Sequence, residues 1–176
     1  MITRKARMAD LPAMLDLING FARQGIMLPR NEFELSESIR DFTVVEREGT
    51  VLGCAALHFY GPEFAEVRSL AVAREAQGSG AGRLLMEALD REAREFEVGV
   101  LFAFTYVPGF FAKAGYREID RGLLPLKAWK DCLRCPKFTA CDEIAVVREL
   151  RPGLLKEAAA RAIEPELVQL PMLRAN

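Results

Sequence analysis

The sequence has no long hydrophobic run, no excess of charge of either sign and only one histidine. No stretch approaches the roughly 20 consecutive apolar residues that a membrane-spanning helix needs. The 176 residues carry 24 Lys and Arg against 25 Asp and Glu, and this net charge of -1 gives no broad attraction to nucleic acid or anionic membrane. We therefore predict a protein without nucleic-acid or membrane partners. Because MITRKARMADL at the N-terminus has no secretory apolar region, we expect it to be cytoplasmic.

Cysteine is scarce as well, but three of the four cysteines lie close together. Cys132, Cys135 and Cys141 have the tight first pair of a zinc site and lack a second one. A fourth ligand would have to come from Cys54, His58 or Asp142. We predict no metal and three reduced thiols that pack a loop. A metal bound by the three cysteines and a labile disulfide within the first pair are the alternatives.

The length fits one domain with a proper core. We predict that this domain covers residues 1–150, with a distinct cysteine-containing segment at 120–148. Residues 151–176 form a tail with a helix expected at 154–163. The apolar run LVQLPML at 167–173 suits either a homodimer contact or a docked chain end.

Apolar periodicity predicts alternating strands and helices. The expected strands cover 2–6, 42–60 as a hairpin, 64–72, 98–106 and 144–150. The expected helices begin near Asp10, at the capping pattern Asn31-x-x-Glu34, after the glycines that end at 82, and at 108. Leu11, Leu15 and Ile18, with Phe21 or Ala22, should form the buried stripe of the first helix. A strand, a long helix and a strand in succession imply that 64–72 and 98–104 pair in parallel, so the predicted α/β fold has a mixed sheet.

The segment QGSGAG at 77–82 places three glycines immediately before a helix. Helix starts leave backbone N–H groups without intrahelical partners, and glycines let a ligand approach those donors. Arg83 follows as a cation, so the segment suits a diphosphate. A Walker A loop would continue with Lys and Ser or Thr, and a dinucleotide-binding loop would follow the first strand of its unit. A flexible loop without a ligand is the alternative.

A first resemblance is carried by the antiparallel strands, the pattern Gln77-x-x-Gly80-x-Gly82, the parallel apolar strand and the segment FFAKAGY. Over residues 2–120 the chain resembles the GNAT superfamily of N-acetyltransferases. The resemblance implies a central mixed sheet of six to seven strands with helices on both faces, and acetyl-CoA as cosubstrate. It assigns cofactor contacts to Leu70, Ala71, Val72, Gln77, Gly78, Ser79, Gly80, Ala81, Gly82, Arg83 and Phe111.

Acetyl transfer needs a base for the amine, and the resemblance points to Glu66. By strand alternation Glu66 lies on the same face as Leu70. The alternatives are Glu63 as the base or a merely solvated Glu66. The superfamily's usual tyrosine acid corresponds to Phe111 here, so Tyr106, a water molecule or departure as free thiolate takes its place. For His58 we expect a structural role.

A second resemblance is carried by the stretches GIMLPR, GCAAL, AEVRSLAV and LPLKAWKDCLRCPKFTACDEIAV. It is to the short bacterial N-acetylglutamate synthases and extends over almost the whole chain, to about residue 148. This implies L-glutamate as acceptor, with L-glutamine as a second option, in the first step of arginine biosynthesis. The substrate-binding candidates are Arg30, Arg68, Ser69 and Lys127, although the cations are equally compatible with an exposed surface. Acetylation of another small amine or a protein N-terminus, and a non-catalytic acyl-CoA sensor, are the competing functions.

Overall fold

The computed structural model describes residues 1–124, 135, 137 and 140–157. Its strands are β1 (Ile2–Lys5), β2 (Phe42–Arg47), β3 (Thr50–Phe59), β4 (Phe64–Val72), β5 (Val100–Thr105), β6 (Arg117–Glu118) and β7 (Ile144–Glu149). Its helices of more than one turn are α1 (Leu11–Ala22), α2 (Glu32–Glu37), α3 (Ala81–Glu95) and α4 (Pro108–Lys113). Every element expected from the sequence up to residue 150 is present, with boundaries within a few residues of those expected.

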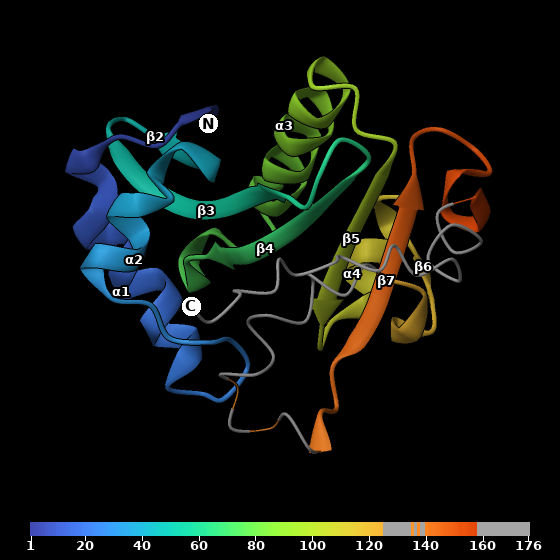
Figure 1. Cartoon of the computed structure of the whole chain (residues 1–176). Helices are drawn as coiled ribbons and strands as arrows, with labels where there is room; N and C mark the ends of the chain where they lie inside the picture. Colours follow the sequence, from blue (N-terminus) through green and yellow to red (C-terminus); the bar gives the residue numbers. More distant parts are fainter. Residues whose placement is uncertain (125–134, 136, 138–139, 158–176) are drawn as a thin grey trace, which may run out of the picture.

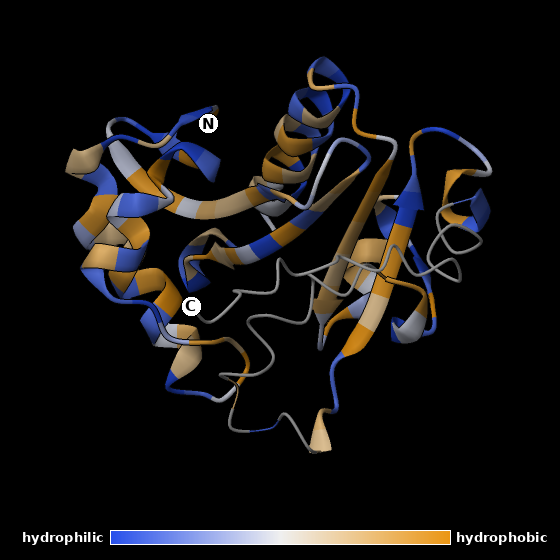
Figure 2. Cartoon of the chain, in the orientation of Figure 1, coloured by the Kyte–Doolittle hydropathy of each residue, from blue (hydrophilic) through white to orange (hydrophobic). Residues whose placement is uncertain are grey.

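The seven strands form one mixed sheet in the order β1-β2-β3-β4-β5-β7-β6 (Figure 1). Only β4 and β5 run in parallel, and all other neighbours are antiparallel. The strands β5 and β7, which have a neighbour on each side, are mostly apolar, as expected for strands that are covered on both faces (Figure 2). The predicted mixed sheet of six to seven strands is confirmed, and so is the parallel pair.

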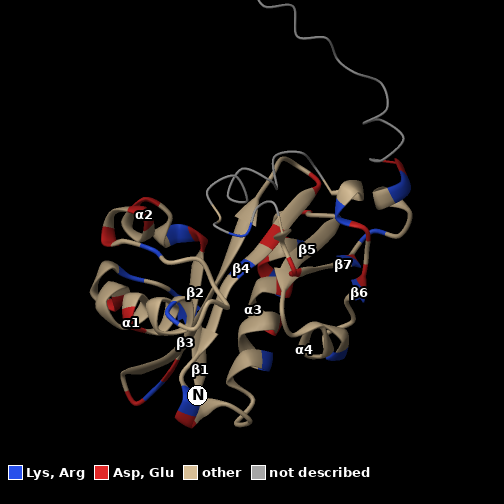
Figure 3. Ribbon diagram, turned by 90° about the horizontal axis from the view of Figure 1, so that it is seen from below, with Lys and Arg blue, Asp and Glu red and all other residues tan. Residues whose placement is uncertain are grey.

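Helices cover both faces of the sheet (Figure 3). On one face α1 and α2 contribute Leu11, Met14, Ile18 and Leu35 to a buried apolar cluster. The predicted Leu15 is only half-buried, because Met14 occupies the centre of the helix face that meets the sheet. On the other face α3 and α4 form a second cluster with the opposite side of β2 to β5.

Local hydrogen bonds fix the start of α2 and the turn that precedes α1. The Asn31 side chain accepts from the Glu34 amide at 2.9 Å, and the Glu34 carboxylate accepts from the Asn31 amide at 3.2 Å, as the capping pattern predicts. Asp10 accepts from the Arg7 amide at 2.7 Å and from both terminal nitrogens of Arg4. The Arg4 guanidinium holds the pKa of Asp10 below its usual value.

Residues 154–157 begin the helix expected in the tail, and the rest of the predicted helix lies outside the described residues. Leu154 and Leu155 are buried in a third apolar cluster with Phe64, Val100 and Phe102. The chain therefore keeps packing against the sheet beyond β7. No helix in the described part of the chain has both the length and the apolar character needed to cross a membrane.

Candidate functional site

The two parallel strands pair over only part of their length. Phe64 to Glu66 pair with Val100 to Phe102, and beyond them β4 and β5 part, although β4 continues to Val72 and β5 to Thr105 (Figure 1). Backbone groups in the gap lack the partners that a continuous sheet would supply. A cavity of about 550 Å³ opens there. Its wall includes residues of β4, β5, α4, the loop after α1 and the segment before β7.

A β-bulge reverses which side chains of the second half of β4 face each side of the sheet. Ala56 of β3 pairs with Arg68, whereas Cys54, two residues earlier, pairs with Ala71, so β4 holds one extra residue between these pairs. Ser69 has a φ of 53°, a left-handed conformation that is uncommon for a residue with a side chain. Strand alternation is broken at Ser69. The expectation that Leu70 shares a face with Glu66 is therefore wrong.

The bulge divides the predicted residues of β4 between the two faces of the sheet. Leu70 and Val72 pack towards the cluster that contains α3, and Ala71 towards the cluster that contains α1. Glu66 follows Phe64, a member of the third cluster, on the opposite face from Leu70. Glu66, Leu70 and Val72 still line the cavity, together with Arg68 and Ser69, because the cavity passes through the gap in the sheet. Ala71 does not line it.

Glu66 is a buried carboxylate in the cavity wall. Its side chain accepts a hydrogen bond from the Tyr60 hydroxyl at 2.9 Å, and the residue is 9% exposed. Glu63, the alternative base, is outside the wall and forms an ion pair with Arg151 at 3.4 Å. His58 binds Asp41 through Nδ1 at 2.6 Å and is also outside the wall, in keeping with a structural role.

Three arginines contribute to the described part of the wall. Arg30 is held there by Asn19, whose side-chain amide donates to the Arg30 carbonyl at 2.9 Å and accepts from its N–H at 3.0 Å. Arg68 comes from β4. Arg121, which sequence reasoning missed, comes from the turn after β6 and donates to the Glu143 carbonyl at 2.6 Å. Lys127 lies outside the described residues.

The glycine-rich segment reaches the other end of the cavity. Gly78 and Gly80 have φ values of 77° and 92°, which glycine adopts without strain. Gly82 permits close packing, because a Cβ there would lie 3.1 Å from the Phe110 ring. Of the predicted cofactor contacts in this segment, the wall includes Gln77, Gly78 and Gly82. Ser79, Gly80, Ala81 and Arg83 lie outside the wall, and Arg83 pairs with Glu87.

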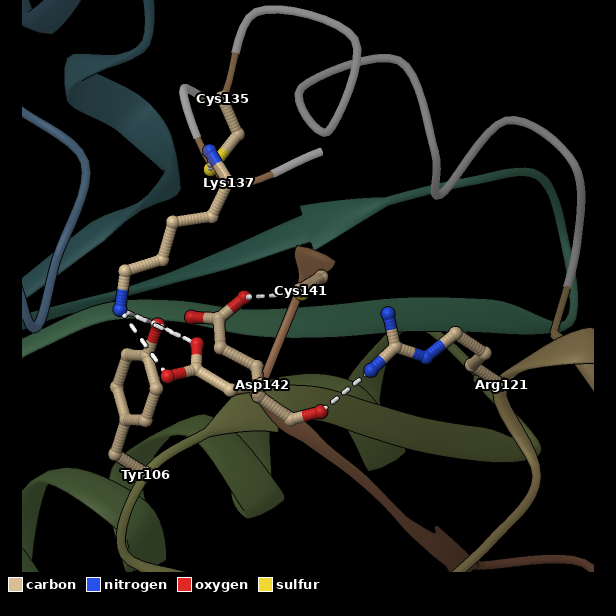
Figure 4. Close-up of polar contacts among 7 residues, drawn as sticks. Tyr106, Arg121, Cys135, Lys137, Cys141 and Asp142 are labelled. Atoms are coloured by element: carbon tan, nitrogen blue, oxygen red, sulfur yellow. Dashed lines mark hydrogen bonds and ion pairs between the residues drawn. The ribbon is translucent and has the colours of Figure 1, made fainter. Parts of the chain in front are cut away.

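The aromatic part of the wall has no hydroxyl on α4. Phe111 is buried there between Phe110 and Tyr116, with ring centroids 5.4 and 5.3 Å away. A tyrosine hydroxyl does reach the wall from the end of β5. Tyr106 donates to Asp142 at 2.7 Å and accepts from the Lys137 ammonium at 3.1 Å (Figure 4). Burial raises the pKa of Tyr106 above its usual value.

Glu143 is a second carboxylate of the wall that sequence reasoning missed. Burial raises its pKa, and the neighbouring Arg121 opposes that shift. Only its place within the cysteine-containing segment, two residues after Cys141, hinted at a role. The described part of the wall thus combines two acidic groups with three arginines, an arrangement that suits a small zwitterion with extra negative charge.

Cys135 and Cys141 also line the cavity, whereas Cys132 lies outside the described residues. The Cys141 thiol is 3.9 Å from a carboxylate oxygen of Glu143 (Figure 4). Cys54 is fully buried, which raises the pKa of its thiol to about 12. Within 1–124, 135, 137 and 140–157, no three His, Cys, Asp or Glu side chains are grouped closely enough to hold a metal ion.

Comparison with known proteins agrees with this geometry. A model of the acetyltransferase (GNAT) family matches residues 12–119. The chain is 46% identical to an uncharacterized N-acetyltransferase of Chlorobaculum tepidum, over 84% of this chain and 95% of that protein. It is 34% identical to an amino-acid acetyltransferase of Mycobacterium tuberculosis, over 68% of this chain and 70% of the relative.

Among solved structures, the chain is similar to the N-acetylglutamate synthase of Neisseria gonorrhoeae in complex with coenzyme A and N-acetyl-glutamate. The TM-score is 0.77 and the sequence identity 30%. The match covers 85% of this chain and 35% of the Neisseria chain, so this chain corresponds to about a third of that protein.

Proposed function

The chain belongs to the acetyltransferase (GNAT) family, and we propose that it transfers the acetyl group of acetyl-CoA to the α-amine of L-glutamate. Acetyl-CoA is the cosubstrate, as the family and the CoA-bound neighbour indicate, and the relatives support an amino acid as acceptor. The product, N-acetyl-L-glutamate, would enter arginine biosynthesis. The observation that carries the proposal is the cavity at the β4–β5 gap, which has glycine backbone at one end and three arginines in its wall.

The donor half of this proposal uses the start of α3. The CoA pyrophosphate would lie against residues 77–82, where the N-terminal N–H groups of a 15-residue helix and its dipole favour an anion. The pantetheine arm would pair with the backbone of β4 where β5 has moved away, on the side of Leu70 and Val72. The thioester would then reach the gap in the sheet beside Glu66.

Replacing Gly78 with aspartate should weaken CoA binding at least tenfold, because it brings a carboxylate close to the pyrophosphate in a poorly screened site. A Cβ at Gly78 meets nothing within 4 Å, so steric overlap in the free protein does not explain the loss. Isothermal titration with CoA measures the effect.

The matched control is Gly49→Asp at the β2–β3 turn. Gly49 has a φ of 79°, close to the 77° of Gly78, and equally open space for a Cβ. Both variants therefore share the charge change and the backbone strain. If the two variants lose CoA affinity equally, the anion site is not at 77–82.

The acceptor half follows from charge. Arg30, Arg68 and Arg121 against Glu66 and Glu143 give the described part of the wall a formal charge of +1 (three positive minus two negative). Glutamate carries two carboxylates and one ammonium group, a net charge of -1. This net charge is equal in magnitude and opposite in sign to that of the described part of the wall. The bound N-acetyl-glutamate of the Neisseria neighbour supports the same choice.

In the proposed mechanism, Glu66 takes a proton from the acceptor's ammonium group, directly or through water. The neutral amine attacks the thioester carbonyl from the Arg68 side of the sheet. A backbone N–H of β4 in the gap stabilises the oxyanion. Tyr60 keeps the Glu66 carboxylate in place through the 2.9 Å hydrogen bond.

Thiol release from acetyl-CoA, measured with each common amino acid in turn, tests the proposal. We expect the highest kcat/KM with glutamate and a lower one with glutamine, because the amide leaves one arginine without a charged partner. Release only with other amines would establish a different acetyltransferase. CoA binding without any release would make the protein an acyl-CoA sensor.

A further inference from the structure

Tyr106 lines the cavity and carries the hydroxyl that the α4 residues of the wall lack. On α4 the wall offers only the rings of Phe110 and Phe111. Tyr106 is the residue after Thr105, at the end of β5 that borders the gap, and its side chain contributes to the same wall. Among the tyrosines of the described chain, Tyr60 and Tyr116 do not line the cavity.

Two charged side chains contact the Tyr106 hydroxyl (Figure 4). The Lys137 ammonium donates to the hydroxyl oxygen at 3.1 Å and lies 4.9 Å from the centre of the ring. Asp142 accepts from the hydroxyl at 2.7 Å and from Lys137 at 3.2 Å. Glu143, the next residue, disfavours a phenolate through its charge. The phenol thus has one cation in direct contact and remains protonated at neutral pH.

We propose that Tyr106 donates its phenolic proton to the sulfur of CoA as the thioester bond breaks, and that Lys137 stabilises the phenolate left behind. The proposal rests on acetyl transfer from acetyl-CoA and deepens that function. A phenol is a weaker acid than a thiol by about 1.5 pKa units, so a cation at the phenol oxygen is needed to offset part of that difference during the transfer. Lys137 supplies that cation, and Asp142 keeps it in place.

The proton balance closes in four steps. Glu66 takes one proton from the ammonium group, the neutral amine nitrogen bonds to the acetyl carbon, and the resulting intermediate loses its extra N–H proton to water. The carbon–sulfur bond breaks, and its electron pair goes to sulfur. Tyr106 rotates its O–H from Asp142 towards the sulfur and protonates it, which gives CoA as the thiol. The phenolate regains a proton from Lys137, and Lys137 regains one from water.

The test compares Tyr106→Phe with Tyr116→Phe. We expect Tyr106→Phe to lower kcat about 30-fold, below the 10²-fold usual for general acid catalysis because a thiolate already leaves readily. KM for acetyl-CoA and the Kd for CoA should stay within about threefold, since the ring remains in place. Tyr116 is buried outside the cavity, so Tyr116→Phe is the matched loss of a hydroxyl and should keep full kcat.

Lys137→Gln should also lower kcat, about tenfold, and Lys137→Arg should restore most of it, because a cation returns to the phenol. Lowered CoA affinity in Tyr106→Phe that matches the fall in kcat would show a structural role and overturn the proposal. A kcat within threefold of wild type in Tyr106→Phe would overturn it as well.

Acetyl-CoA hydrolysis without any amine separates this proposal from the choice of acceptor, because hydrolysis expels the same thiol. If glutamate proves not to be an acceptor, Tyr106→Phe should still lower hydrolysis by the same factor as transfer to the true acceptor. Hydrolysis and transfer that are both independent of Tyr106 would reject the acid while leaving the proposed acceptor intact. Wild-type protein that cleaves acetyl-CoA in neither reaction would reject both.

Discussion

Glu66→Gln is expected to lower kcat for glutamate acetylation about 10³-fold at neutral pH, because a carboxamide cannot accept the proton of the ammonium group. The substitution keeps the shape of the side chain, and its amide oxygen can still accept from Tyr60. The loss should shrink as the pH rises, since solution then supplies more of the neutral amine. Steady-state kinetics between neutral and alkaline pH measure both effects, with CoA affinity as the check on folding.

Two further glutamine variants make this result specific to Glu66. Glu63→Gln removes a carboxylate three residues away that pairs with Arg151 outside the cavity, and we expect kcat within twofold of wild type. Glu143→Gln removes the other carboxylate of the wall. If Glu143→Gln loses activity at neutral pH and Glu66→Gln does not, then Glu143 is the base.

The order and type of the elements followed from the sequence because their causes are local. The alternating apolar residues of β2 to β4, the capping residues Asn31 and Glu34, and the unbroken apolar run of β5 each act within a few neighbours. The parallel pairing of β4 with β5 followed from the handedness of the crossover through α3. The glycines at 78 and 80 were likewise recognisable as positions that allow an unusual backbone before a helix, and in the structure both take positive φ values.

The internal geometry of the site was not predictable, because long-range packing sets it. Nothing in the run EVRSLAV indicates that Ser69 takes a left-handed φ. Only the pairing with β3 reveals the extra residue, and that residue moves Leu70 to the face opposite Glu66. A one-residue slip exchanges the faces of a strand, so an argument from alternation fails wherever a bulge intervenes.

Residues from distant segments were missed for the same reason. Arg121 and Glu143 reach the cavity through the short β6 and the approach to β7, and neither has a periodic pattern around it. Gly82 was read as a ligand contact, and a packing need against Phe110 accounts for it equally well. Arg83 pairs with Glu87 one turn along α3.

The two predicted arginines should recognise different carboxylates of glutamate. The α-carboxylate is attached to the same carbon as the reacting amine, so its partner should lie near the base. Arg68 is two residues from Glu66, before the bulge and on the same face of β4. Arg30 enters from the loop after α1, where Asn19 fixes its backbone. We therefore assign the α-carboxylate to Arg68 and the side-chain carboxylate to Arg30.

Arg68→Met should then lower kcat/KM about 10²-fold with glutamate and equally with glutamine, because both acceptors keep the α-carboxylate and losing a charged pair in a cavity costs about 2–5 kcal/mol. Arg30→Met should lower kcat/KM about 10²-fold with glutamate and less than about threefold with glutamine, since the amide has no charge to lose. The exposed Arg47→Met is the control and should change neither value. Equal losses with both acceptors in Arg30→Met, or a loss confined to glutamate in Arg68→Met, would contradict the assignment, because each arginine acts through the carboxylate that it binds.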